Sequence, residues 1–194
     1  MVPPDARPPS PRVLRRRPAA ARPSEWAVSS RSPDDTARLG RRLGRALRGG
    51  EILALSGELG SGKTALLRGV AAGLGAPPRS VSSPTFVLVQ EYAGRLRLLH
   101  ADLYRIAGPE EAAELGLAQD LDERTVLAVE WAERAGTELG GDRLEIHLRH
   151  RGPRSRDLHF RGTGPLALAC LTRLRRAGPL RRRMGSAAGR RVRP

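Results

Sequence analysis

Residues 51–74 read Glu-Ile-Leu-Ala-Leu-Ser-Gly-Glu-Leu-Gly-Ser-Gly-Lys-Thr-Ala-Leu-Leu-Arg-Gly-Val-Ala-Ala-Gly-Leu. The first six residues form a short, mostly apolar run of strand length, and apolar side chains recur at helical spacing after Thr64. Strand, loop and helix in this order are the context in which a Gly-x-x-x-x-Gly-Lys-[Ser/Thr] pattern binds phosphate. We therefore predict a nucleotide-binding loop, with a ligand-free glycine-rich turn as the alternative. Its eight residues are Gly57, Glu58, Leu59, Gly60, Ser61, Gly62, Lys63 and Thr64.

Lysine occurs only once in this sequence, and that one lysine is in the loop. The sequence has 35 Lys and Arg residues, and Lys63 is the only lysine among them. An ammonium is a compact point charge that can lie against phosphates, whereas a guanidinium is planar and larger. The loop glycines let backbone N–H groups turn inward, and the helix N-terminus adds partial positive charge. We expect Lys63 and the loop amides to hold the phosphates, and the Thr64 hydroxyl to bind Mg²⁺.

Two acidic residues end apolar, strand-like runs. Asp102 follows Leu98-Leu99-His100-Ala101, and Glu130 follows Val126-Leu127-Ala128-Val129. Sites that hydrolyse nucleotides use such an acid to hold or orient Mg²⁺. Each acid alone is equally compatible with a surface position, but two of them together with a phosphate loop indicate catalytic positions.

A third polar segment lies between the loop and these acids. Ser82-Ser83-Pro84-Thr85-Phe86 combines hydroxyl side chains with a fixed proline turn. We expect it to bring the Thr85 hydroxyl toward the γ-phosphate or the metal, as a switch segment does. The alternative is a strand entry with proline at its start.

The remaining sequence predicts an α/β fold with a mixed sheet of the P-loop NTPase type, parallel at its centre and antiparallel at its margins. Ser32 caps a helix that runs to about Arg48, and residues 93–95 join two strands as a hairpin. The other expected elements are strands at 25–29, 51–56, 86–92, 96–102, 125–130, 143–150 and 155–160, and helices at 64–74 and 109–115. We divide the chain into a disordered Pro/Arg-rich tail at 1–24, an ATPase domain at 25–164, a C-terminal helix at 165–177 and a disordered basic tail at 178–194.

Charge is concentrated outside the central segment. Of the net charge of +15, residues 1–24 carry +5 and residues 165–194 carry +9, which leaves +1 for residues 25–164. A nearly neutral body disfavours a nucleic-acid platform on the folded domain. No apolar run approaches the roughly 18 residues of a membrane span, and the N-terminal arginines lack the apolar stretch of a secretory signal. We expect a cytoplasmic protein without membrane contact, in which the single Cys170 is a core residue.

Four motifs together resemble one protein family. They are Gly-Glu-Leu-Gly-Ser-Gly-Lys-Thr at 57–64, Ser-Pro-Thr-Phe at 83–86, His-Ala-Asp-Leu-Tyr-Arg at 100–105 and Glu-Trp at 130–131. In order and spacing they resemble the signatures of the TsaE (YjeE) family over roughly residues 25–162. Members of that family are bacterial ATPases that work with the TsaB–TsaD pair in making the N6-threonylcarbamoyladenosine (t6A) of tRNA. The arginine-rich extensions lie outside the resemblance.

The resemblance implies a role for each matching residue. Thr64 and Glu130 would be the Mg²⁺ ligands, Lys63 the phosphate-binding lysine, and Asp102 the acid that orients metal or water. Ser32 and Thr36 match a family Ser-x-x-x-Thr near the nucleotide base, although helix capping explains them equally well. The resemblance also implies ATP with Mg²⁺ as cofactors, the TsaB–TsaD complex as partner, and tRNA contacted indirectly through that complex.

Three other function classes fit the sequence less well. A GTPase reads guanine with Asn-Lys-x-Asp, which needs a second lysine, so adenine is the expected base. A small-molecule kinase would use the same loop, with arginines 149–156 as a lid, but those arginines fall within a period-two strand pattern. An RNA-binding module would interleave aromatic and basic residues, and neither tail contains an aromatic residue.

Five further side chains, one tryptophan and four histidines, lie within or outside these motifs. Trp131 either anchors the core, which we favour, or packs beside the nucleotide. His100 is expected to support Asp102 through a hydrogen bond, or to be a buried structural histidine. His147, His150 and His159 are placed on edge strands, where they lack the spacing of metal ligands.

Overall fold

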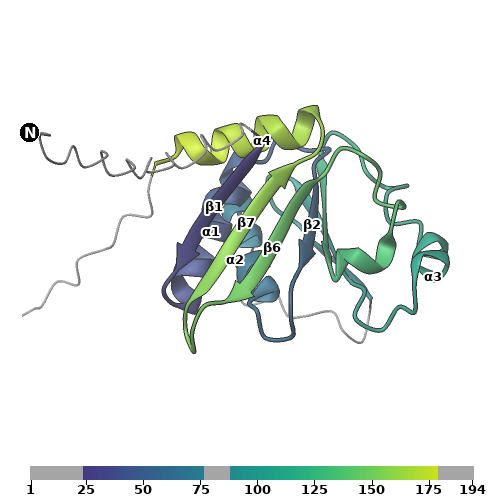
Figure 1. The fold of residues 1–194 in the computed structure, drawn as a ribbon. Coiled ribbons are helices and arrows are strands. Elements are labelled where there is room, and N and C mark those ends of the chain that lie inside the picture. Colours follow the sequence, from purple (N-terminus) through teal and green to yellow (C-terminus); the bar gives the residue numbers. More distant parts are fainter. Residues whose placement is uncertain (1–23, 77–87, 179–194) are drawn as a thin grey trace, which may run out of the picture.

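The fold is built around one seven-stranded sheet, seen in a computed structural model that describes residues 24–76 and 88–178 (Figure 1). The strand order is β1-β7-β6-β2-β5-β4-β3. The pairs β6–β2, β2–β5 and β5–β4 are parallel, whereas β1–β7, β7–β6 and β4–β3 are antiparallel. The sequence-based expectation of a parallel centre with antiparallel margins is therefore confirmed. The strands are β1 (Glu25–Ser30), β2 (Ile52–Ser56), β3 (Val89–Tyr92), β4 (Arg97–Asp102), β5 (Thr125–Glu130), β6 (Leu144–His150) and β7 (Arg156–Gly162).

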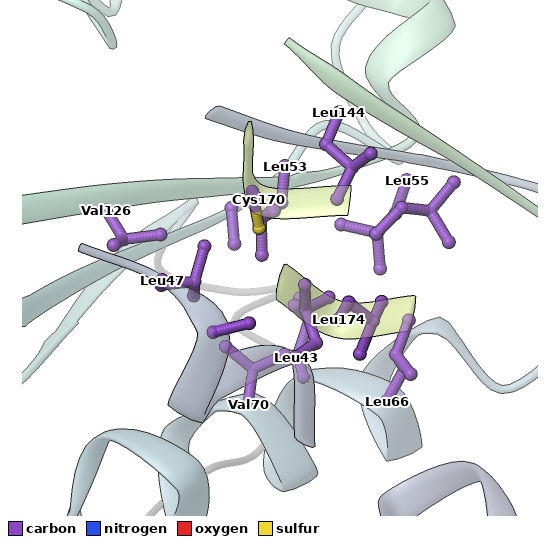
Figure 2. Packing of buried hydrophobic residues seen from close by; sticks show 14 of the residues in the cluster. Leu43, Leu47, Leu53, Leu55, Leu66, Val70, Val126, Leu144, Cys170 and Leu174 are labelled. Carbon is purple, nitrogen blue, oxygen red and sulfur yellow. The ribbon is translucent and has the colours of Figure 1, made fainter. Parts of the chain in front are cut away.

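Alternate residues of the central strands supply two separate cores. Leu53 and Leu55 of β2 face a cluster shared with α1 and α2, whereas Ile52 and Ala54 face a second cluster with α3 and η2. This division follows from the period-two geometry of a strand covered on both faces. Figure 2 shows the first cluster, in which Cys170 lies among leucines. The helices are α1 (Pro33–Ala46), α2 (Lys63–Leu74), α3 (Pro109–Glu114), the 3₁₀ helix η2 (Ala132–Ala135) and α4 (Pro165–Arg176).

Helices α1 and α2 are held together by glycines. Gly40 and Gly44 of α1 approach Gly69 and Gly73 of α2 so closely that a Cβ on any of the four would meet backbone atoms of the other helix within 2.3 Å. Ser32 caps α1, since its Oγ accepts a hydrogen bond from the Asp35 amide at 3.1 Å. The first residue of α2 is Lys63, so the phosphate loop leads directly into the helix that packs closely against α1.

Helix α4 joins the main core. Its buried residues Cys170, Leu171 and Leu174 belong to the cluster of α1 and α2, and burial raises the pKa of the Cys170 thiol to about 12. Arg173 donates to a Glu51 oxygen at 2.7 Å and to the Ala46 carbonyl at 2.6 Å. Three arginines that the sequence placed in the basic C-terminal segment (Arg173, Arg175 and Arg176) therefore belong to a packed helix. The expectations of disorder at 1–24 and 178–194 fall almost wholly outside the described residues.

One face of strands β1, β7 and β6 has no helix over it within residues 24–76 and 88–178. Strands β1, β7 and β6 lie at the front of Figure 1 without a covering helix, and their outward side chains His147, His159 and Arg161 are exposed. Both β6 and β7 are interior strands with a neighbour on each side, so the placement of His147, His150 and His159 on edge strands was wrong. Among the described residues, no helix is long and apolar enough to cross a bilayer.

Candidate functional site

The site begins where β2 passes into α2. Gly57, Gly60 and Gly62 of the intervening loop all have positive φ angles, of 134°, 73° and 102°. Side chains with a Cβ rarely adopt this left-handed region, so the loop shape requires glycine at these positions. Helix α2 then begins without a side-chain cap at Gly62. Its first-turn N–H groups are therefore available to a ligand, which is the arrangement that binds anions.

Lys63 is buried at the base of this loop. Its side chain is 4% exposed, and Nζ donates to the carbonyl oxygens of Gly57 at 2.7 Å and Glu58 at 3.1 Å. Burial lowers the pKa of Lys63 below its ordinary value, and the negative charges of Glu130, Glu133 and Asp102 oppose that effect. The ammonium is thus a desolvated positive charge that gains strongly from a nearby anion.

The two predicted acids lie side by side at the end of the sheet. Asp102 and Glu130 are partners in the β4–β5 register, and each is 3% exposed. Glu130 is the last residue of β5, the strand next to β2, and its carboxylate reaches α2, where Thr64 Oγ1 donates to Glu130 Oε2 at 3.2 Å. Asp102 Oδ1 accepts from the Tyr104 amide at 3.0 Å. The carboxyl ends of β4 and β5 thereby bring both acids to the edge of the sheet where the phosphate loop lies.

His100 supports a different acid from the one expected. Its Nε2 lies 3.0 Å from Glu130 Oε1, and both side chains are buried. Its Nδ1 has no hydrogen-bond partner within the described part of the chain. The expected support of Asp102 is therefore corrected: His100 lies against Glu130, whose two carboxylate oxygens contact Thr64 and His100.

Trp131 lies between the second core cluster and the phosphate loop. The half-buried ring packs against the second core cluster, and the Lys63 ammonium lies 3.9 Å from the ring centroid. Trp131 has a φ angle of 58°, a left-handed conformation that costs about 1–3 kcal/mol for a bulky residue. Because the Trp131 ring contacts the Lys63 ammonium and its backbone is strained, we place Trp131 in the candidate site as well as in the core.

The remaining predicted residues lie at the start of α1, in segment 82–86 and on the β6–β7 hairpin. Ser32 caps α1, as the capping alternative expected. Thr36 is buried and its Oγ1 lies 2.8 Å from Ser30 Oγ, while its methyl group faces the phosphate loop, 3.9 Å from where a Cβ on Gly62 would stand. Thr85, with the whole switch-like segment 82–86, falls outside the described residues. The arginines considered as a kinase lid lie on β6, on β7 and in the turn between them.

The donor set suits a nucleotide with Mg²⁺. Magnesium is usually held by one or two carboxylates together with phosphate oxygens and water, and seldom by a cage of protein ligands alone. Residues 24–76 and 88–178 contain no group of three or more His, Cys, Asp or Glu side chains that could hold a metal. Glu130 and Thr64 supply one carboxylate and one hydroxyl. Ser61 adds a buried Oγ inside the loop that has no partner among the described residues.

Comparisons with known proteins point to one family. The family model described as threonylcarbamoyl adenosine biosynthesis protein TsaE matches residues 30–158. Proteins named tRNA threonylcarbamoyladenosine biosynthesis protein TsaE are similar in Treponema pallidum, with 42% identity over 62% of this chain and 88% of the relative, and in Bacillus subtilis, with 36% identity over 69% and 83%.

The solved structures include a similar fold. The crystal structure of Bacillus subtilis YdiB superposes with a TM-score of 0.64 and 28% identity, and the match covers 79% of this chain and 95% of that chain. A family match over residues 30–158, relatives matched over most of their own length and a similar fold converge on one conclusion. The chain belongs to the TsaE family of threonylcarbamoyl adenosine biosynthesis proteins.

Proposed function

We propose that the protein binds ATP with Mg²⁺ and hydrolyses it slowly, in support of a TsaB–TsaD complex that makes t6A in tRNA. The observation that carries the proposal is the convergence of Lys63, Thr64 and Glu130 at the uncapped start of α2. A buried cation, a metal-binding hydroxyl and a carboxylate are the parts that phosphoryl transfer requires. Family membership supports the connection to t6A.

Each residue has a distinct part in this proposal. The loop amides and Lys63 bind the phosphates, and Thr64 with Glu130 would hold Mg²⁺, which neutralises phosphate charge when it is bound. His100 orients the Glu130 carboxylate through the 3.0 Å contact. Asp102 and Thr85 position the water or the γ-phosphate. Thr85 enters from the sequence alone.

Hydrolysis in the service of a partner is favoured over an independent reaction. The four sequence motifs account for nucleotide and metal, and no motif of an acyl-transfer or tRNA-modifying centre accompanies them. The energy of hydrolysis would then drive a conformational cycle of the TsaB–TsaD complex. A cytoplasmic location and an indirect contact with tRNA belong to the same proposal.

The test follows the γ-phosphate. Incubation of the protein with γ-labelled ATP and Mg²⁺ should release free phosphate, and the TsaB–TsaD complex should accelerate the release. Glu130→Gln should abolish the acceleration, whereas Glu138→Gln, at an exposed carboxylate, should not. Stoichiometric transfer of the label to a small molecule, without free phosphate, would support the kinase alternative and refute the proposal. GTP competing as well as ATP would refute the adenine preference.

A further inference from the structure

An arginine outside the phosphate-loop motif holds the outer side of the loop. Arg156, the first residue of β7, donates from Nε to the Ser61 carbonyl at 3.0 Å and from Nη2 to the Gly60 carbonyl at 3.1 Å. Its Nη1 donates to the carbonyls of Gly152 and Ser155, at 3.1 and 2.8 Å. One guanidinium thus ties two loop carbonyls to the turn between β6 and β7.

These contacts determine which way the loop amides face. In a trans peptide unit the C=O of one residue and the N–H of the next point in opposite directions. Arg156 draws the carbonyls of Gly60 and Ser61 toward itself, so the N–H groups of Ser61 and Gly62 point away from it. The Ser61 amide donates to Glu58 within the loop at 3.1 Å. The Gly62 amide is therefore the group whose direction Arg156 sets.

The same hairpin supports the loop at two other points. A Cβ on Gly57 would lie 2.3 Å from the Leu148 carbonyl, so the start of the loop rests directly on β6. His150 Nε2 lies 3.5 Å from the Leu59 carbonyl. The loop therefore lies against the end of the β6–β7 hairpin, and Arg156 makes the only contact among these with a permanently charged group.

We infer that Arg156 is a positioning residue that holds the phosphate loop in its phosphate-accepting conformation. This inference rests on the proposed ATP binding and extends it to a residue beyond the motif. Glycines at positive φ make the loop shape possible but leave it flexible, so an external clamp lowers the entropy lost when phosphate binds. Only the planar fork of arginine reaches both carbonyls and the turn together, which a lysine ammonium cannot do.

The test compares Arg156→Ala, Arg156→Lys and the control Arg154→Ala, an exposed arginine in the same turn. Calorimetric titration with Mg-ATP should show affinity reduced by about tenfold or more in Arg156→Ala, the range for loss of a charged hydrogen bond. Arg156→Lys should also bind weakly, because charge without the fork is insufficient. Arg154→Ala should match the wild type.

Chemical rescue separates positioning from general folding. Guanidinium ion at millimolar concentration should restore much of the ATP affinity of Arg156→Ala and leave Arg154→Ala unchanged, with thermal unfolding confirming that each variant is folded. Wild-type affinity in Arg156→Ala or Arg156→Lys would overturn the inference. So would a loss in Arg156→Ala that matches its loss of folded protein. Failure of the wild type itself to bind Mg-ATP would refute the proposed function, and this inference with it.

Discussion

A glycine-to-alanine substitution at the contact between α1 and α2 tests the structure, because helix propensity alone predicts a more stable protein and the close contact predicts a less stable one. Gly44→Ala places a Cβ 2.3 Å from the Val70 carbonyl oxygen and 2.9 Å from Gly73 Cα, both of which are backbone atoms. Non-bonded heavy atoms normally stay about 3.5 Å apart, so the helices must separate by about 1 Å locally. No side-chain rotation can relieve this contact.

Two opposing free energies decide the outcome. Alanine is better than glycine inside a helix by about 1 kcal/mol, whereas overpacking typically costs about 1–3 kcal/mol, and more when the backbone must move. With a clash against the backbone, the cost lies at the upper end, and we expect a net loss of about 2 kcal/mol. For a chain of this length that corresponds to a fall in Tm of about 4–8 °C.

The assay is thermal unfolding together with Mg-ATP titration. Displacement of α2 also moves Lys63, so ATP affinity should fall along with Tm. Arg45→Ala, at an exposed position of the same helix, should change the free energy of unfolding by less than about 0.5 kcal/mol. A Gly44→Ala variant more stable than the wild type, as helix propensity alone predicts, would refute the close contact.

The remaining predictions concern the site and the tails. Glu130→Gln should weaken Mg-dependent ATP binding, whereas Asp102→Asn should lower turnover more than binding; unchanged ATPase rates in both variants with the partner present would remove both acids from the site. Because burial lowers the pKa of Lys63 and a bound anion favours the charged form, ATP affinity should be constant at lower pH and fall as the pH rises toward the usual lysine value of about 10.4. Titrations at increasing pH should show that fall in the wild type, and a pH-independent affinity would contradict it; Lys63→Ala should lack the dependence. A chain shortened to residues 24–178 should keep ATP binding, since Ser24 and Gly178 carbonyls still accept hydrogen bonds within the fold. If the arginine-rich tails help to dock a tRNA-bearing complex, the full-length protein should form t6A faster than the shortened protein at about 50 mM salt and lose this advantage at about 200 mM. Equal t6A formation by the two proteins at both salt concentrations would show that the tails do not contribute to docking.

The sequence predicted the parts of the site that depend on local patterns. The phosphate loop is contiguous, and the runs before Asp102 and Glu130 are apolar enough to predict strands whose ends carry an acid. Because the carboxyl ends of neighbouring parallel strands lie at the same edge of a sheet, the strand prediction alone places the two acids together. Strand β5 shows this most clearly, because all of its residues from Thr125 to Glu130 are buried.

Register and long-range pairing explain what the sequence could not predict. His100 lies opposite Ala128 in the β4–β5 pair, so its ring extends past a small side chain to Glu130, and only the pairing reveals this partner. The alternation of apolar and polar residues in β6 and β7 is compatible with edge strands, but it reflects one exposed face of two interior strands. The role of Arg156 depends on a hydrogen bond to a loop almost a hundred residues away.

The most direct test of the account is the affinity for Mg-ATP of the wild type, Lys63→Ala and Lys63→Arg, measured by calorimetric titration. We predict measurable binding by the wild type and a loss of about tenfold or more in Lys63→Ala, because the bound phosphate would lose its charged partner. Lys63→Arg keeps the charge but should not restore affinity, since the site of Nζ is enclosed by two loop carbonyls and the Trp131 ring. Equal affinity in the three proteins would contradict the assignment of this loop as the nucleotide site.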